Sequence, residues 1–112
     1  MTFISYNDFL KVNIRVGTII EAKENNLLKK PSIILTIDFG EKIGNKKSSA
    51  QLKSNYSCSD LVNKQIAAVV NFPPKQIGNI MSEVLVLGFP DEDNEPILIK
   101  PESKVKNGKK LY

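Results

Sequence analysis

The stretch SIILTIDFG, residues 32–40, decides the fold class. Large apolar side chains recur at every second position from Ile33 to Phe39. A period of two is typical of a β-strand that buries one face and exposes the other. Gly40 ends the run. We therefore predict a half-buried strand here and look for the same signal on either side.

Neighbouring segments repeat the pattern. Residues 14–22 alternate in the same way, with Gly17 in the middle, and a glycine inside a strand is typical of a bulge or sharp bend. Residues 66–72 are apolar on both faces as far as Asn71 and predict a central strand, which Pro73 and Pro74 end because proline cannot donate to a ladder. Residues 84–88 and 97–99 predict two further short strands.

Two short helices are predicted, one over residues 8–11 capped by Ser5 or Asn7, and one over residues 60–62 capped by Ser57 or Ser59. Five or more short strands with one interposed helix favour an all-β architecture. Because closure removes exposed strand edges, we expect a five-stranded Greek-key barrel, the OB-fold, with one or two short helices and terminal extensions. One domain over residues 1–112 is expected.

Composition excludes several kinds of chemistry. The chain has no histidine and one cysteine, Cys58, which excludes Ser-His-Asp and Cys-His catalysis, histidine-ligated metal sites and an internal disulfide. We expect no enzyme activity, no metal and no cofactor. The missing cysteine pairs suggest a cytoplasmic protein. The first residues do not resemble a signal peptide, and no apolar run approaches the roughly 20 residues that insertion into a membrane needs.

The net charge is +4, from 16 basic and 12 acidic residues. This balance permits nucleic-acid binding without demonstrating it, because many soluble proteins are equally basic. Every basic residue except Arg15 is a lysine. Because a planar guanidinium matches a fixed carboxylate, we expect Arg15 to form a structural ion pair.

Several blocks occur in an order that resembles one family. Residues 8–19, DFLKVNIRVGTI, resemble the opening DFxKLDIRVGTI of the tRNA-binding domain family. Further blocks that resemble the short, stand-alone bacterial members are residues 37–44, 47–51, 63–75 and 82–88, ending at Asn107-Gly108. The ordered combination covers residues 8–110. The resemblance implies an OB-fold homodimer in the cytoplasm that binds tRNA. Short bacterial members are also described as export-related chaperones, so unfolded precursor polypeptides or the export machinery remain alternative partners.

The resemblance also implies RNA-binding positions. The family blocks NLKP and SEGM correspond here to the segments that contain Asn71, Lys75 and Ser82. A second patch interleaves lysines with hydroxyls and an amide, which suits phosphate and 2′-OH contacts: Lys46, Lys47, Ser48, Ser49 and Gln51. Lys29 and Lys30 lie in the loop between the first two strands, where longer relatives carry HPxADKL and this chain does not.

Each of these positions has a structural alternative. Asn71 is the one polar residue of an apolar strand, and as a buried amide it needs a hydrogen bond, so its partner is either a neighbouring loop or RNA. Ser82 is either a phosphate donor or a turn residue, and the lysines are either contacts or a solvated edge. The acidic residues 91–95 do not have the spacing of a calcium loop and favour an exposed hairpin tip.

The aromatic residues and the two chain ends indicate which partners to expect. Phe39, Phe72 and Phe89 occupy predicted core positions, which leaves few rings for stacking bases and favours structured RNA recognised through backbone and shape. The resemblance implies that apolar residues at the two ends form the dimer interface, the alternative being that they fold back on their own barrel. These residues are Phe3, Tyr6, Phe9, Leu10, Leu111 and Tyr112. A large exposed apolar patch would favour the chaperone alternative.

Overall fold

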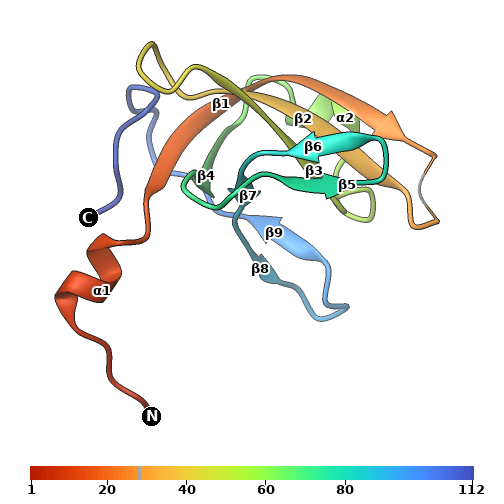
Figure 1. The fold of residues 1–112 in the computed structure, drawn as a ribbon. Helices are drawn as coiled ribbons and strands as arrows, with labels where there is room; N and C mark the ends of the chain where they lie inside the picture. Colours follow the sequence, from red (N-terminus) through yellow and green to blue (C-terminus); the bar gives the residue numbers. More distant parts are fainter. Residues whose placement is uncertain (28) are drawn as a thin grey trace.

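The computed structural model describes residues 1–27 and 29–112 (Figure 1). The described elements are, in chain order, α1 (Tyr6–Leu10), β1 (Ile14–Asn25), β2 (Ser32–Asp38), β3 (Asn45–Ala50), α2 (Cys58–Leu61), β4 (Gln65–Val69), β5 (Lys75–Ile77), β6 (Ile80–Ser82), β7 (Leu85–Val86), β8 (Gly88–Pro90) and β9 (Pro96–Leu98).

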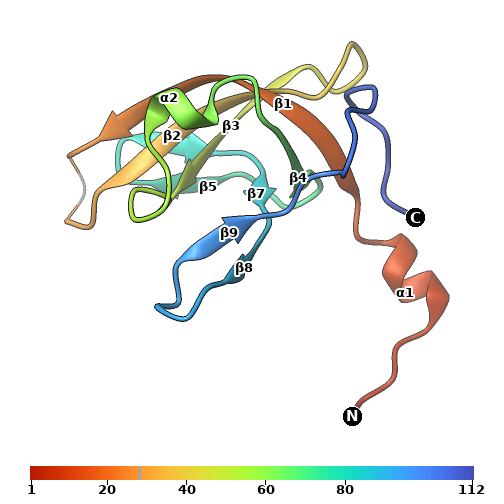
Figure 2. The same cartoon turned by 180° about the vertical axis from the view of Figure 1, so that it is seen from behind.

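The main sheet has five antiparallel strands in the order β3-β2-β1-β4-β7. It curls strongly on itself, and the two hairpins β5–β6 and β8–β9 lie against its open side (Figures 1 and 2). The order of three strands, a helix and further strands is the order predicted for an OB-type fold. The all-β prediction is therefore confirmed.

The core lies inside the curl. Alternate residues of β2, namely Ile33, Leu35 and Ile37, are at most 1% exposed, as the period of two predicts. Phe39 and, from α2, Leu61 complete a fully buried apolar cluster. Burying large aliphatic side chains stabilises a fold by about 1.5–3 kcal/mol each relative to exposure. The helix between β3 and β4 thus closes one side of the core.

Gly17 allows the backbone of β1 to lie close to the side chains of Ile37 and Phe39. A Cβ atom at this position would lie 2.7 Å from both Ile37 Cγ2 and Phe39 Cδ1, so a larger residue would clash. The bulge expected at this glycine lies instead between Ile19 and Glu21, where the register with β2 shifts. The glycine is therefore required for packing, and the strand bends three residues later.

Both helices begin at a predicted serine cap. Ser5 and Ser57 each accept a hydrogen bond from the backbone N–H three residues on, and the aspartates there, Asp8 and Asp60, bond back to the cap. The hydrogen bonds with Ser57 lower the pKa of Asp60 below its ordinary value. Cys58 is the first residue of α2 and is half-buried.

Three strand predictions need correction. β4 ends at Val69, two residues before Asn71, and the Val70 N–H bonds to the Asn13 carbonyl just beyond the last strand pair. Residues 84–88 form two separate strands, β7 and β8, since Leu87 interrupts them. The hairpin β5–β6 was not predicted, because three-residue strands are too short to show a period.

The two ends of the described chain differ in how they attach. The C-terminal segment lies along β1, where the Gly108 N–H bonds to the Val16 carbonyl and the Leu111 N–H to the Ile14 carbonyl, both at 2.8 Å. In contrast, α1 projects from the barrel and has no buried residue (Figures 1 and 2). Neither described helix has the length or apolar character that a bilayer crossing requires.

Candidate nucleic-acid interface

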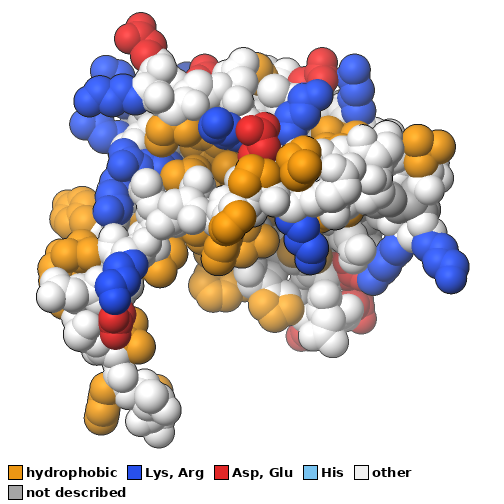
Figure 3. Space-filling model, viewed as in Figure 1, with side chains coloured by type: hydrophobic (Ala, Val, Ile, Leu, Met, Phe, Trp, Pro, Cys, Tyr) orange, Lys and Arg blue, Asp and Glu red, His pale blue; other side chains and the backbone are white. Residues whose placement is uncertain are grey.

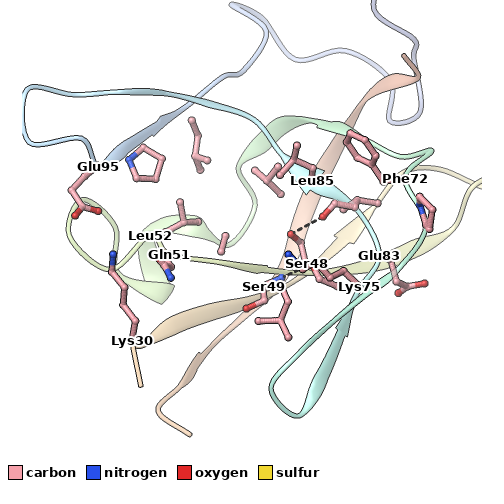
Figure 4. Close-up of a pocket in the computed structure, with 18 of the residues that line it drawn as sticks. Lys30, Ser48, Ser49, Gln51, Leu52, Phe72, Lys75, Glu83, Leu85 and Glu95 are labelled. Atoms are coloured by element: carbon pink, nitrogen blue, oxygen red, sulfur yellow. Dashed lines mark hydrogen bonds between the residues drawn. The ribbon is translucent and has the colours of Figure 1, made fainter. Parts of the chain in front are cut away.

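A groove of about 690 Å³ lies between β3, the β5–β6 hairpin, residues 83–86 and the β8–β9 hairpin (Figure 4). Lys30 reaches it from the β1–β2 loop, and Glu95 reaches it from the loop between β8 and β9. OB-folds bind their ligands on the face of the second and third strands and at the loops that join strands 1–2 and strands 4–5. In this sheet those loops are the β1–β2 loop, which supplies Lys30, and residues 70–84 between β4 and β7, which supply Lys75. The groove is therefore at the position where this architecture presents a ligand site.

Six of the ten predicted RNA-binding residues line this groove. They are Lys30, Ser48, Ser49, Gln51, Lys75 and Ser82. The lining does not include Lys29, which is exposed beside Lys30, nor Lys46 and Lys47, which lie earlier on β3. Asn71 also lies outside it. Residues from three separate sequence blocks thus meet on one face.

The three serines, however, already have partners. Ser48 Oγ donates to the Val84 carbonyl at 3.0 Å, and Ser82 Oγ accepts from the Ser49 N–H at 3.1 Å. Ser49 Oγ lies 3.1 Å from Ser32 Oγ. These bonds hold β3 against β6 and the segment before β7, so the hydroxyls stabilise the barrel. The groups left to meet a ligand are the lysines and the exposed Gln51.

The lysines around the groove fall into two kinds. Lys46 Nζ lies 3.7 Å from Glu83 Oε2, and the other oxygen of Glu83 accepts from the Lys47 N–H. Within residues 1–27 and 29–112, the ammonium groups of Lys30, Lys47 and Lys75 have no carboxylate within 4.0 Å. Figure 4 places Lys30 and Lys75 toward opposite ends of the groove.

The groove between these lysines is largely apolar. Phe72 and Leu85 are 54% and 50% exposed, and Leu52, Val84, Val86 and Leu98 also line it. The prediction that Phe72 belongs to the core is wrong, because β4 ends three residues before it and its alternation no longer applies. Phe89 is also exposed, since it pairs only with Ile97 across a hairpin outside the core.

Asn71 is exposed, although a buried side chain was expected. Its Oδ1 accepts from the Asn13 N–H at 3.0 Å, and its Nδ2 donates to the Lys11 carbonyl at 2.7 Å. The amide therefore ties the end of β4 to the link between α1 and β1. This is the structural alternative that the sequence left open for Asn71.

A second hollow, of about 370 Å³, lies where the C-terminal segment meets β1 and β4. Four cations line it, Arg15, Lys100, Lys109 and Lys110, together with apolar residues that include Leu111 and Tyr112. We call it the basic hollow. Figure 3 shows Lys and Arg side chains gathered over the C-terminal segment and the neighbouring β2–β3 turn.

The ion pair predicted for Arg15 is not formed. Arg15 Nε donates to Asn13 Oδ1 at 2.7 Å and Nη1 donates to the Gly108 carbonyl at 2.9 Å, both neutral acceptors. No carboxylate of the described residues lies within 4.0 Å of its nitrogens. The sequence did not reveal this environment, because Gly108 is 93 positions away and no local pattern links the two.

The acidic residues 91–95 form an ordered tip on the β8–β9 hairpin. Asp91 Oδ1 accepts from the backbone N–H groups of Asp93 and Glu95, and its Oδ2 accepts from Asn55 Nδ2 at 3.0 Å. The bond from Asn55, with smaller contributions from the backbone donors, lowers the pKa of Asp91. Among the described residues, no three acidic or cysteine side chains gather in a metal-binding arrangement.

Comparison with known proteins identifies the family. Residues 14–110 match the family model described as "Putative tRNA binding domain". The chaperone CsaA of Bacillus anthracis str. Ames has a similar crystal structure, with a TM-score of 0.92 and 42% identity, covering 99% of this chain and 100% of that one. The CsaA chaperone protein of Picrophilus torridus gives a TM-score of 0.90 and 49% identity over 98% and 100%.

A methionine–tRNA ligase of Pyrococcus horikoshii is 32% identical over 111 residues, which are 99% of this chain and 15% of the ligase. The chain spans about 15% of the length of the first curated relatives that it matches. The predicted resemblance, including that to the short stand-alone bacterial branch, is confirmed. With the family model matching nearly the whole chain, this protein belongs to the tRNA-binding domain family.

Proposed function

We propose that this chain binds tRNA as a non-catalytic homodimer and recognises structured RNA through its backbone and shape. Membership in the tRNA-binding domain family supports the ligand class. One observation carries the proposal: unpaired lysines, Lys30 and Lys75, flank the groove on the face that OB-folds use for ligands. Lysines without carboxylate partners can neutralise phosphates at little cost. Because the proposed ligand is tRNA, we propose that the protein acts in the cytoplasm.

The homodimer rests on the projecting arm. Phe3, Tyr6 and Tyr112 are 89%, 68% and 101% exposed, and Leu10 and Leu111 are also exposed. Phe9 is half-buried, and its ring centroid lies 6.2 Å from that of Tyr6. Apart from Phe9, these side chains of the N-terminal arm, residues 1–12, and of the last two residues face water and are not folded onto the barrel. A two-fold partner that covers them would gain the free energy of apolar burial. Sedimentation of the protein should therefore give twice the monomer mass.

Filter binding of bulk tRNA at several salt concentrations tests the RNA proposal. If about six phosphates are neutralised, affinity should fall by about three orders of magnitude between 50 and 200 mM salt. Lys30→Ala with Lys75→Ala should weaken binding and lower the slope of log K against log salt. The matched control is Lys23→Ala with Lys53→Ala, since these lysines lie 3.7 and 3.4 Å from Glu21 and Glu24. A salt-independent affinity would contradict the proposal.

The apolar lining of the groove favours a second candidate function, the holding of unfolded precursor polypeptides, including those bound for the export machinery. Phe72 and Leu85 are large side chains exposed in a concave surface, which suits apolar segments of an unfolded chain. The similar solved structures carry the name chaperone. Light scattering of a denatured client tests this function. Undiminished aggregation in the presence of excess protein would rule it out.

A further inference from the structure

The groove contains one exposed aromatic ring. Among the described residues that line it, Phe72 is the only aromatic side chain, and it is 54% exposed. The other large exposed rings lie elsewhere, on the N-terminal arm, at Tyr112 and at Phe89 on the β8–β9 hairpin. A ring that faces water in a concave surface offers a flat apolar face to a ligand. With a single ring, the groove can stack one planar group and not a row of them.

The backbone holds this ring in place before a ligand arrives. On one side, the Asn71 side chain accepts from the Asn13 N–H and donates to the Lys11 carbonyl. On the other side, Pro73 restricts the residue before it, Phe72, to extended conformations. Because the backbone is fixed on both sides, binding costs little conformational entropy at this residue. More of the free energy of stacking is therefore available for affinity.

The charges at this end of the groove favour a nucleotide. Figure 4 shows Phe72, Lys75 and Glu83 toward the same end. The Glu83 carboxylate is already in use, since one oxygen lies 3.7 Å from Lys46 Nζ and the other accepts from the Lys47 N–H. Lys75 has no carboxylate within 4.0 Å in the described part of the chain. An exposed ring together with a free cation is complementary to a planar base joined to an anionic phosphate.

We propose that one unpaired base of the bound RNA stacks on Phe72 while a neighbouring phosphate contacts Lys75. This inference rests on the proposed tRNA binding and names the part of the RNA that the groove takes. A folded RNA presents such bases in loops and bulges, where aromatic side chains commonly stack on them. An apolar side chain of an unfolded polypeptide would use the ring but would bring no counter-charge to the lysine. The combination of ring and lysine therefore favours RNA as the occupant.

A pair of RNA duplexes tests this assignment. One duplex has a single bulged adenosine, and the other has an abasic nucleotide at the bulge, so that the phosphates are the same and only the base differs. The wild-type protein should bind the adenosine duplex about 5- to 150-fold more tightly, the range expected for one base stacked on an aromatic ring. Phe72→Ala should bind both duplexes equally. The control Phe89→Ala, at an exposed ring outside the groove, should keep the wild-type preference.

The salt dependence of binding separates stacking from charge. Phe72→Ala removes no charge, so it should weaken binding of the adenosine duplex by the same factor at every salt concentration. Lys75→Ala should instead lower the slope of log K against log salt by about 0.7–0.9, the contribution of one phosphate contact. The control Lys23→Ala, at a lysine whose Nζ lies 3.7 Å from Glu21, should leave the slope unchanged.

Tryptophan at the same position reports stacking directly. The chain contains no tryptophan, so Phe72→Trp introduces a single fluorophore and keeps an aromatic face in the groove. This variant should bind the adenosine duplex at least as tightly as the wild type does. Its emission should be quenched by the adenosine duplex and not by the abasic one. The emission of Phe89→Trp should change with neither duplex.

The outcomes separate this inference from the proposed function. If the wild-type protein binds tRNA but does not prefer the adenosine duplex, the inference is wrong and the proposed function stands. If Phe72→Ala loses the mass of a dimer in sedimentation, the ring belongs to the subunit interface and the inference is also wrong. The same holds if Phe72→Ala changes only the holding of a denatured polypeptide. If the wild-type protein does not bind tRNA, the proposed function fails first and this inference fails with it.

Discussion

The groove and the basic hollow use lysine in different surroundings. Around the groove, Glu83 neutralises Lys46 and the floor between Lys30 and Lys75 is apolar. In the basic hollow, cations lie together over the C-terminal segment without an acidic neighbour. A net charge of +4 does not distinguish these two surfaces. The difference lies in where the acidic residues stand, which sets the local charge of each surface as much as the number of lysines does.

The largest expected effect comes from detaching the C-terminal segment, residues 108–111, from β1. Gly108 has φ +92°, and a Cβ there would lie 2.5 Å from the Phe39 carbonyl oxygen. Gly108→Ala should therefore destabilise the protein by about 1–3 kcal/mol through backbone strain, with more from the clash. The basic hollow should be lost and the groove retained. Urea unfolding measures the stability.

Gly44→Ala provides the matched control, because its φ of +79° is also positive but nothing lies within 4 Å of the added Cβ. It should strain the β2–β3 turn without reaching the hollow. If both variants lost the same free energy of unfolding, the clash with the Phe39 carbonyl would not be what makes a glycine necessary at position 108.

Loss of a buried hydroxyl beside the groove is expected to lower the free energy of unfolding. Ser48 is 2% exposed and donates to the Val84 carbonyl, so Ser48→Ala leaves that buried acceptor without its donor. A loss of about 1–3 kcal/mol in the free energy of unfolding is expected. Urea denaturation measures it. Ser59→Ala, at an exposed hydroxyl on α2, is the control, and an equal loss there would contradict this account.

Substitution of exposed aromatic residues tests whether the groove itself holds unfolded clients, with little effect on the fold. Phe72→Ala removes a ring that is 54% exposed, so the stability should change little, while holding of a denatured client should decrease several-fold. Phe89→Ala, at a ring 69% exposed outside the groove, should leave holding unchanged. Light scattering compares the two variants. Equal effects would show that exposure alone, and not the groove, carries the activity.

The smallest expected effect is on pH dependence at the acidic tip beside the groove. The folded pKa of Asp91 is below its ordinary value of 3.8, so its contribution to stability is present above pH 3.8 and is lost as pH falls through the folded pKa. The stability difference between wild type and Asp91→Asn should accordingly shrink below pH 3.8. Thermal unfolding at pH 5 and pH 3 measures it, and a constant difference would contradict the assignment.

Local signals predicted the fold well and the sites less completely. The alternation of residues 32–40 and the serine caps act over a few residues, so they identified β2 and both helices. Five of the six predicted residues in the groove come from the family blocks, and the sixth, Lys30, comes from its position in the β1–β2 loop. The internal use of Ser48 and Ser82, and the bond from Arg15 to the Gly108 carbonyl, depend on contacts across 33 to 93 positions, which no local pattern encodes.

The attachment of residues 108–111 to residues 14–16 has a consequence during synthesis. The basic hollow needs residues from both ends of the chain. During synthesis on the ribosome, the strands that form the groove are therefore made before the residues that complete the hollow. A chain that stops before Gly108 keeps the bond from Arg15 Nε to Asn13 but lacks the carbonyl that accepts from Nη1. Prematurely terminated products would therefore leave this edge of β1 without its last pairing partner.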